Sequence, residues 1–232
     1  MKLPEVIAHR GMPREHPENT LPGFAQALEA GVQGIELDVH ATRDGVVVVH
    51  HDPVVAAPET REAHAAPSPL RIDQLSFDEL RRLDGARGIP PLAQVLSLVD
   101  GRARVYVEVK ATGIEDRVID LVEPRADWCA IHSFDHRIVA AIRRAAPVVR
   151  CGVLMSSYLV HPLAPLRDTG ALDLWQHWSM IDEPLVGAVQ AEGGRVIAWT
   201  VNDVAVAATL RSWGVDGICT DTARDLVPLV RH

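Results

Sequence analysis

Residues 34–41 read GIELDVHA, and the alternation within this stretch decides the fold. Branched apolar side chains alternate here with Glu36 and Asp38, so on a strand the two carboxylates leave one face and the apolar side chains leave the other. We expect the apolar face to pack against helices. The carboxylate face then points into a polar space, which the mouth of a β/α barrel provides.

Short runs rich in β-branched residues recur along the chain on both sides of this stretch, and amphipathic segments separate them. The runs predict strands at residues 6–10, 34–41, 104–110, 129–134, 150–156, 171–178, 195–201 and 217–220. The segments between them predict helices at residues 21–30, 77–83 with 92–99, 115–122, 136–145, 163–169, 183–192, 204–213 and 223–230. Repeated strand-then-helix units imply a parallel sheet, and about eight of them favour closure into a TIM (β/α)8 barrel. The alternative is an open doubly wound sheet, but no GxGxxG sequence follows a predicted strand.

One stretch interrupts this rhythm after the second predicted strand. Residues 46–51 form another short extended run, and residues 53–70 are rich in alanine, proline and glutamate. A loop of this length inside a compact domain usually carries function. We therefore predict a single domain over residues 1–232, with a small insertion whose residues 53–70 fold over one end of the barrel as a lid.

Composition limits the classes of protein that fit. Of the 232 residues, 47% are hydrophobic and 23% are charged, which allows a sizeable core. The formal net charge of −8 argues against a nucleic-acid binder, although a local cluster of cations can still bind an anionic substrate. Cys129, Cys151 and Cys219 lie in separate apolar runs without CxxC spacing, which predicts buried free thiols in a reducing compartment. We find no signal-peptide pattern and no apolar run of membrane-spanning length, so we expect a cytoplasmic protein.

Acidic residues gather on two of the predicted strands. Glu36 and Asp38 lie on the second strand and Glu108 lies on the third, where a barrel carries its catalytic groups. Three carboxylates in one barrel mouth repel one another unless a cation lies between them, and oxygen ligands favour Mg²⁺ or Ca²⁺, with Mn²⁺ as a further candidate. The alternative is an ion network in which the acids of the second strand pair with Arg10 or Lys110.

Histidines and cations complete a set suited to phosphate chemistry. Histidine titrates near neutrality, so His9 and His51 can serve as the acid and the base of a phosphodiester hydrolysis. Arg10 and Lys110 supply positive charge for phosphate oxygens. Trp199 has an apolar face suited to the carbon side of a small polyol, and packing inside the barrel is an equal alternative for this residue.

Several motifs follow one another in an order that covers nearly the whole chain. They are HRG at 9–11 with PENT at 17–20, GIELDVHATRDGVVVVHHDP at 34–53, VEVK at 107–110, AWTV at 198–201 and GVDGICTD at 214–221. In this order the motifs resemble the glycerophosphodiester phosphodiesterase family. Members of that family are metal-dependent TIM barrels that cleave glycerophosphodiesters to sn-glycerol 3-phosphate and an alcohol.

The resemblance implies roles for individual residues. His9 and His51 would be the general acid–base pair, Glu36, Asp38 and Glu108 the metal ligands, Arg10 and Lys110 the phosphate contacts, and Glu18 and Asn19 the supports of the loop after the first strand. Many members continue from HD with a leucine and an Arg-Thr-Thr pattern, whereas residues 53–66 here read PVVAAPETREAHAA. This excursion is similar in position to the family's insertion, which covers the glycerol moiety. We therefore expect the departure to affect substrate preference rather than reaction class.

Three other functions are alternatives. A lysophospholipase D would need an apolar groove and usually a membrane anchor, and no anchoring segment is visible. A phosphatidylinositol-specific phospholipase C is another barrel with a histidine pair, but the HRG, PENT and VEVK motifs fit it less well. A non-catalytic phosphodiester-binding barrel would be expected to lack one of the acid–base or metal residues, and none is missing. The sequence does not specify the head group of the substrate, the identity of the divalent cation or the oligomeric state. It also does not specify which histidine acts first as the base, or whether water or a substrate hydroxyl is the nucleophile.

Overall fold

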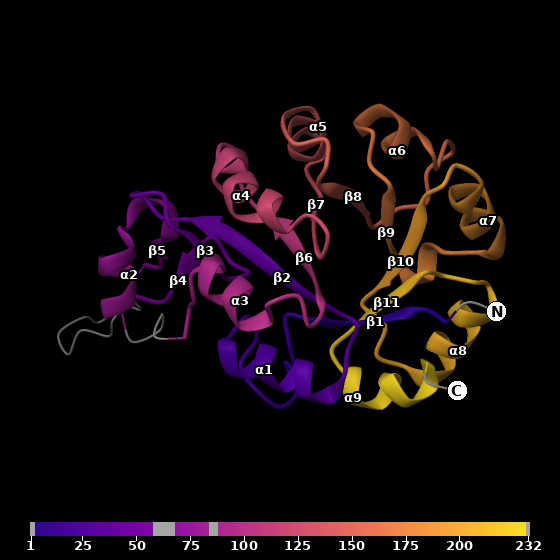
Figure 1. Ribbon diagram of the computed structural model, residues 1–232, viewed down its shortest axis with the longest axis horizontal. Helices are drawn as coiled ribbons and strands as arrows, with labels where there is room; N and C mark the ends of the chain where they lie inside the picture. The colour runs from indigo at the N-terminus through magenta and orange to yellow at the C-terminus, as the bar shows by residue number, and fades with distance from the viewer. Residues whose placement is uncertain (1–2, 58–67, 84–87, 231–232) are drawn as a thin grey trace.

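In the computed structural model, which describes residues 3–57, 68–83 and 88–230, eight parallel strands close into a barrel (Figure 1). They are β1 (Glu5–His9), β2 (Gly34–Ala41), β6 (Arg104–Val109), β7 (Cys129–Ser133), β8 (Arg150–Met155), β9 (Asp173–His177), β10 (Arg195–Trp199) and β11 (Gly217–Thr220). Closure comes from β1, which pairs with β11 on one side and with β2 on the other. The predicted TIM barrel is therefore confirmed, because an open sheet would leave an edge at this point.

Helices cover the outside of the barrel (Figure 1). They are α1 (Leu21–Ala30), α3 (Leu92–Val99), α4 (Glu115–Val122), α5 (His136–Ala145), α6 (Ala164–Thr169), α7 (Glu183–Ala191), α8 (Val204–Ser212) and α9 (Ala223–Leu226). Short 3-10 turns occur at η3 (Glu123–Arg125), η4 (Trp178–Met180) and η5 (Val227–Val230). The aspartates Asp135, Asp182 and Asp203 begin α5, α7 and α8 by accepting hydrogen bonds from backbone N–H groups of the first turn.

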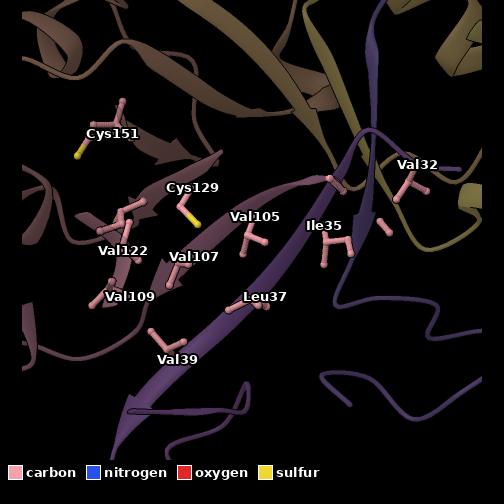
Figure 2. Packing of buried hydrophobic residues seen from close by; sticks show 14 of the residues in the cluster. Val32, Ile35, Leu37, Val39, Val105, Val107, Val109, Val122, Cys129 and Cys151 are labelled. Atoms are coloured by element: carbon pink, nitrogen blue, oxygen red, sulfur yellow. The ribbon is translucent and has the colours of Figure 1, made fainter. Parts of the chain in front are cut away.

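The strands separate two apolar layers. Ile35, Leu37 and Val39 of β2 point outward and join the layer between the sheet and the helices, together with valines of β6 (Figure 2). A smaller inner cluster consists of Ile7, Tyr106, Ala130, Leu154, Trp175, Ile197 and Cys219. The alternation predicted for residues 34–41 is confirmed. The inner face of the strands carries the carboxylates and this inner cluster.

The insertion forms a small unit beside the barrel. The strand β3 (Val47–Val49) runs antiparallel to β2, and β4 (Val54–Val55) pairs with β5 (Leu70–Arg71) before η1 (Ile72–Gln74) and α2 (Phe77–Arg82). Val48, Val55, Ile72 and Leu80 give this unit its own apolar cluster. Residues 58–67 of the predicted lid lie outside the described residues, so the lid stays a prediction.

Two further expectations concern the cysteines and membrane-spanning segments. Cys129, Cys151 and Cys219 are buried and form no disulfide, as predicted. Within the ranges that the structure describes, we find no helix with the length and apolarity needed to cross a membrane.

Candidate active site

A cavity of about 190 Å³ opens where the barrel strands end. His9 and Trp199 at the cavity wall are the last residues of β1 and β10. Seven of the ten residues predicted for the site line this cavity: His9, Arg10, Glu36, His51, Glu108, Lys110 and Trp199. Of the other three, Glu18 and Asp38 contact Arg10, and Asn19 contacts Asp38.

The loop after β1 gives Arg10 its position. Arg10 has a φ of 52° and Gly11 a φ of 88°, which turns the chain sharply at the end of the strand. A methyl group on Gly11 would lie 3.0 Å from the carbonyl carbon of Gly23, so only glycine fits here without displacing α1. The backbone N–H of Asn19 donates to the carbonyl of Arg10 at 2.9 Å and closes the loop.

Strand register brings three side chains with metal-ligand chemistry together. Glu36 lies on β2, Glu108 lies on β6 opposite Asp38, and His132 lies on β7 opposite Glu108. Glu36, Glu108 and His132 each present one ligand atom, and these three atoms lie within 4.8 Å of one another. All three residues are buried, so the group can surround a small cation.

Asp38 has a different environment from the other two acids. Its carboxylate lies 3.0 Å from Arg10 Nε and 3.0 Å from Lys110 Nζ, and it accepts a 2.9 Å hydrogen bond from Asn19 Nδ2. Burial opposes its ionisation, but the charges of Lys110 and Arg10 and the Asn19 hydrogen bond lower the pKa of Asp38 to about 2. Glu18 contacts Arg10 at 3.1 Å from the other side. The ion network that is the alternative for Asp38 is therefore present. The role of Asp38 as a metal ligand stays a prediction.

Glu108 shows the opposite shift. Burial raises the pKa of Glu108, although Lys110 Nζ lies only 2.7 Å from its carboxylate and His132 is nearby. Lys110 bridges Glu108 and Asp38, and the two acids raise the pKa of Lys110 despite its burial. Lys110 therefore carries a firm positive charge at the cavity wall.

His9 is held by partners from the other side of the barrel. Its Nδ1 lies 2.6 Å from Asp221 Oδ1, and because a carboxylate only accepts, Nδ1 is the donor. Asn202 Nδ2 donates to Asp221 at 2.7 Å, and the backbone N–H of Asp221 donates back to Asn202 at 2.8 Å. Burial by itself lowers the pKa of His9, but the hydrogen bond to Asp221 and the charge of Glu36 raise it above its ordinary value.

His51 enters the same cavity from the end of the β2–β3 hairpin. Its Nδ1 lies 2.8 Å from Asp52 Oδ1, which leaves the other ring nitrogen for a substrate. His40 Nε2 lies 3.1 Å from the carbonyl oxygen of His51 and fixes the backbone there. Each of the two histidines predicted as acid and base is therefore paired with a carboxylate.

Aromatic rings form the apolar wall of the cavity. Trp199 meets Phe134 edge to face at 5.4 Å and His177 at 5.3 Å. The Trp199 Nε1 is buried and has no hydrogen-bond partner among the described residues. Trp199 therefore offers an apolar ring to a ligand in the cavity.

Sequence patterns did not identify the contributions of His132, Asp221 and Asn202. His132 follows the inward alternation of β7, but its neighbours come from β2 and β6, which local spacing does not reveal. Asp221 follows the last strand, where a catalytic group is expected, yet its contact with His9 spans 212 positions of sequence. The position at a strand end was the one available signal.

Comparison with known proteins places this chain in a family. Residues 9–224 match the glycerophosphoryl diester phosphodiesterase family. A glycerophosphodiester phosphodiesterase of Caldanaerobacter subterraneus subsp. tengcongensis is 31% identical over 243 residues, with 97% of each chain covered.

Solved structures show the same architecture. A putative glycerophosphoryl diester phosphodiesterase from Silicibacter pomeroyi superimposes with a TM-score of 0.85 at 25% identity, covering 99% of this chain and 94% of that one. A phosphodiesterase from Oleispira antarctica, solved in complex with the product sn-glycerol-3-phosphate, gives a TM-score of 0.85 at 24% identity and covers 99% of this chain and 98% of that one. This chain belongs to the glycerophosphoryl diester phosphodiesterase family and is an enzyme that hydrolyses glycerophosphodiesters.

Proposed function

We propose that this enzyme acts with a divalent cation, uses His9 and His51 as its general acid–base pair, and releases sn-glycerol 3-phosphate and an alcohol. The observation that carries the proposal is that two imidazoles, each held by a carboxylate, border the same cavity as Arg10 and Lys110. The product held by the Oleispira antarctica phosphodiesterase is the compound that we propose this chain to release.

The donor set fits a divalent cation. Glu36 is buried, and within the described part of the chain it has neither lysine nor arginine at ion-pair distance. Its contacts are the backbone N–H of Arg10 at 3.3 Å and the rings of His9 and His132 at 3.9 and 3.7 Å. A buried carboxylate with so little compensation is costly, and a cation would remove that cost. The predicted set of Glu36, Asp38 and Glu108 is rich in oxygen, which suits Mg²⁺, Ca²⁺ or Mn²⁺.

The cations of the chain bind and orient the phosphodiester. Arg10 presents a guanidinium held by Glu18 and Asp38, and Lys110 presents an ammonium held by Asp38 and Glu108. Both groups keep their charge, so they can contact phosphate oxygens without rearrangement. When bound, a divalent cation neutralises charge that develops on those oxygens.

The histidines then move two protons. One imidazole takes a proton from the attacking hydroxyl group, and the other gives a proton to the leaving alkoxide. The Nδ1 atoms of His9 and His51 are occupied by Asp221 and Asp52, so the Nε2 atoms carry this exchange. Water can supply the attacking oxygen directly; alternatively the glycerol 2-hydroxyl supplies it, forming a cyclic phosphate that water then opens to glycerol 3-phosphate.

The test is release of glycerol 3-phosphate from a panel of glycerophosphodiesters. Protein stripped with EDTA should be inactive, and restoring Mg²⁺, Ca²⁺ or Mn²⁺ singly should restore release. We expect Glu36→Ala to lose the response to added cation. Unchanged turnover after stripping, or an unchanged titration curve for Glu36→Ala, would contradict the proposed cation dependence.

The acid–base pair is tested by two further variants. We expect His9→Ala and His51→Ala to lower kcat by roughly 10²–10⁴-fold, the usual scale for acid–base groups. His136→Gln is the matched control, because His136 bonds the carbonyl of Leu154 and does not line the cavity. Near-wild-type turnover in either alanine variant would reject that histidine.

A further inference from the structure

We propose that His132 is a nitrogen ligand of the divalent cation and that it directs the site toward Mn²⁺ rather than Ca²⁺. This inference rests on the proposed cation dependence and adds a residue outside the carboxylate set predicted from the sequence. The position of His132, the burial of its ring and the chemistry of imidazole carry the argument.

The position of His132 follows from the order of three neighbouring strands. Glu36 on β2, Glu108 on β6 and His132 on β7 meet on the inner face of the barrel, and His132 lies in register with Glu108. The Nε2 of His132 lies 3.7 Å from Glu36 Oε1. This separation is too long for a hydrogen bond, but it is close to the spacing of two ligands on one cation.

The ring of His132 is buried and incompletely hydrogen-bonded. Its side chain is 2% exposed, and its Nδ1 has no hydrogen-bond partner among the described residues. A buried polar group without a partner costs free energy, and a cation between Nε2 and the two carboxylates would give the ring one strong interaction.

Packing holds the ring in this orientation. His132 stacks on Trp175 with ring centroids 4.2 Å apart and an interplanar angle of 13°. Trp175 is itself buried and meets Tyr106 edge to face at 5.0 Å. The imidazole therefore cannot turn away from Glu36 and Glu108 without displacing the inner core.

The chemistry of imidazole determines which cation the site binds more tightly. Ca²⁺ and Mg²⁺ prefer oxygen ligands, whereas transition metals bind imidazole nitrogen well. A site with Glu36, Glu108 and His132 consequently favours Mn²⁺ over Ca²⁺ more than a site of carboxylates alone. The preference for Mn²⁺ over Ca²⁺ therefore comes from His132 on β7 and not from the carboxylates of β2.

The test measures cation binding directly. Mn²⁺ and Ca²⁺ affinities are determined by calorimetry on the full chain, and the nitrogen ligand is sought by electron spin-echo modulation of bound Mn²⁺. The first variant, His132→Phe, keeps a flat ring on Trp175 and removes both nitrogen atoms, and His132→Gln is a second variant with an oxygen ligand. His9→Gln removes the other imidazole near Glu36, and His136→Gln is the control at a half-buried histidine that does not line the cavity.

We expect nitrogen modulation in the wild type and in His9→Gln, and its loss in both His132 variants. Mn²⁺ affinity should fall at least about tenfold in His132→Phe, the scale seen even for groups one step removed from a metal. Ca²⁺ affinity should change less, and His136→Gln should match the wild type.

Three results would overturn the inference. The first is bound Mn²⁺ without nitrogen modulation in the wild type, a measurement that needs no variant to fold. The second is modulation that persists in folded His132→Phe or His132→Gln. The third is an equal change in Mn²⁺ and Ca²⁺ affinity. Hydrolysis that continues after removal of every cation would instead overturn the proposed function, and the inference with it.

Discussion

At the scale of single residues, the two histidines of the site differ in how firmly their carboxylate partners are held. Asp221 beside His9 is half-buried and fixed by two hydrogen bonds with Asn202. Asp52 beside His51 is exposed and adjacent in sequence. The charge of Asp221 is therefore the one able to act on its histidine with little screening by water.

Replacing Asp221 with asparagine keeps the shape of the side chain and removes its charge. We expect Asp221→Asn to lower kcat about 10²-fold, with little change in KM, because Asp221 does not line the cavity. The anion stabilises the imidazolium form, so its loss lowers the pKa of His9, and the limb of the pH–rate profile that His9 controls moves to lower pH.

The measurement is the pH dependence of kcat for the wild type and Asp221→Asn, with Asp52→Asn as the matched comparison at the exposed carboxylate. A profile that keeps its limb in place would show that Asp221 does not tune His9.

Side chains that alternation places on one face of a strand could be predicted from the sequence, whereas the contacts that His132 and Asp221 make across strands could not. Alternation along β2 sufficed to place Glu36 and Asp38 on the inner face. His132 meets Glu36 through the register of three strands, and Asp221 meets His9 through closure of the barrel. Neither relation leaves a period or a spacing in the chain.

At the scale of elements, periodicity predicts the barrel, the extended run of β3 and the helix α2, but not the two shortest strands of the insertion. The eight barrel strands and their helices have several residues each, enough for an alternation or an apolar stripe to show. The strands β4 and β5 have two residues each and pair with one another across an intervening segment. Such short elements depend on the apolar cluster around Val48 and Ile72 rather than on a pattern of their own.

The inner face of β8 has little space for a side chain at position 152. A methyl group on Gly152 would lie 2.8 Å from Cδ1 and 3.0 Å from Nε1 of Trp175, the ring that supports His132. We expect Gly152→Ala to lower the free energy of unfolding by about 1–3 kcal/mol, the cost of overpacking a filled core. Because Trp175 must shift, turnover should fall as well.

Urea unfolding and steady-state kinetics measure the two effects. Gly187→Ala is the matched control, since Gly187 lies in α7 with no atom within 4 Å of an added methyl group. Alanine should raise the free energy of unfolding there by about 0.5–1 kcal/mol. Equal stability of Gly152→Ala and the wild type would show that β8 has room for a side chain.

At the scale of the whole molecule, the two ends of the barrel carry different groups of charged residues. The cavity lies where the strands finish, while a second charged network lies where they begin. Asp173 at the start of β9 accepts hydrogen bonds from Arg150 of β8 and Arg195 of β10. Arg195 also donates hydrogen bonds to Glu5 of β1 and to the hydroxyl of Tyr106 on β6. The network therefore joins five strands at this end of the barrel.

Asp173→Asn tests whether this network serves stability alone. The substitution leaves two arginines facing a neutral amide, and breaking a buried pair costs about 3–5 kcal/mol. Part of each arginine remains in solvent, so we expect a loss near the lower end, about 3 kcal/mol, in urea unfolding. Glu192→Gln breaks an exposed pair with Arg167 and should leave stability unchanged. Since Asp173 lies at the far end of the barrel from the cavity, kcat and KM of folded Asp173→Asn should match the wild type. A fall in kcat without a loss of stability would mean that the two ends are coupled through the inner core.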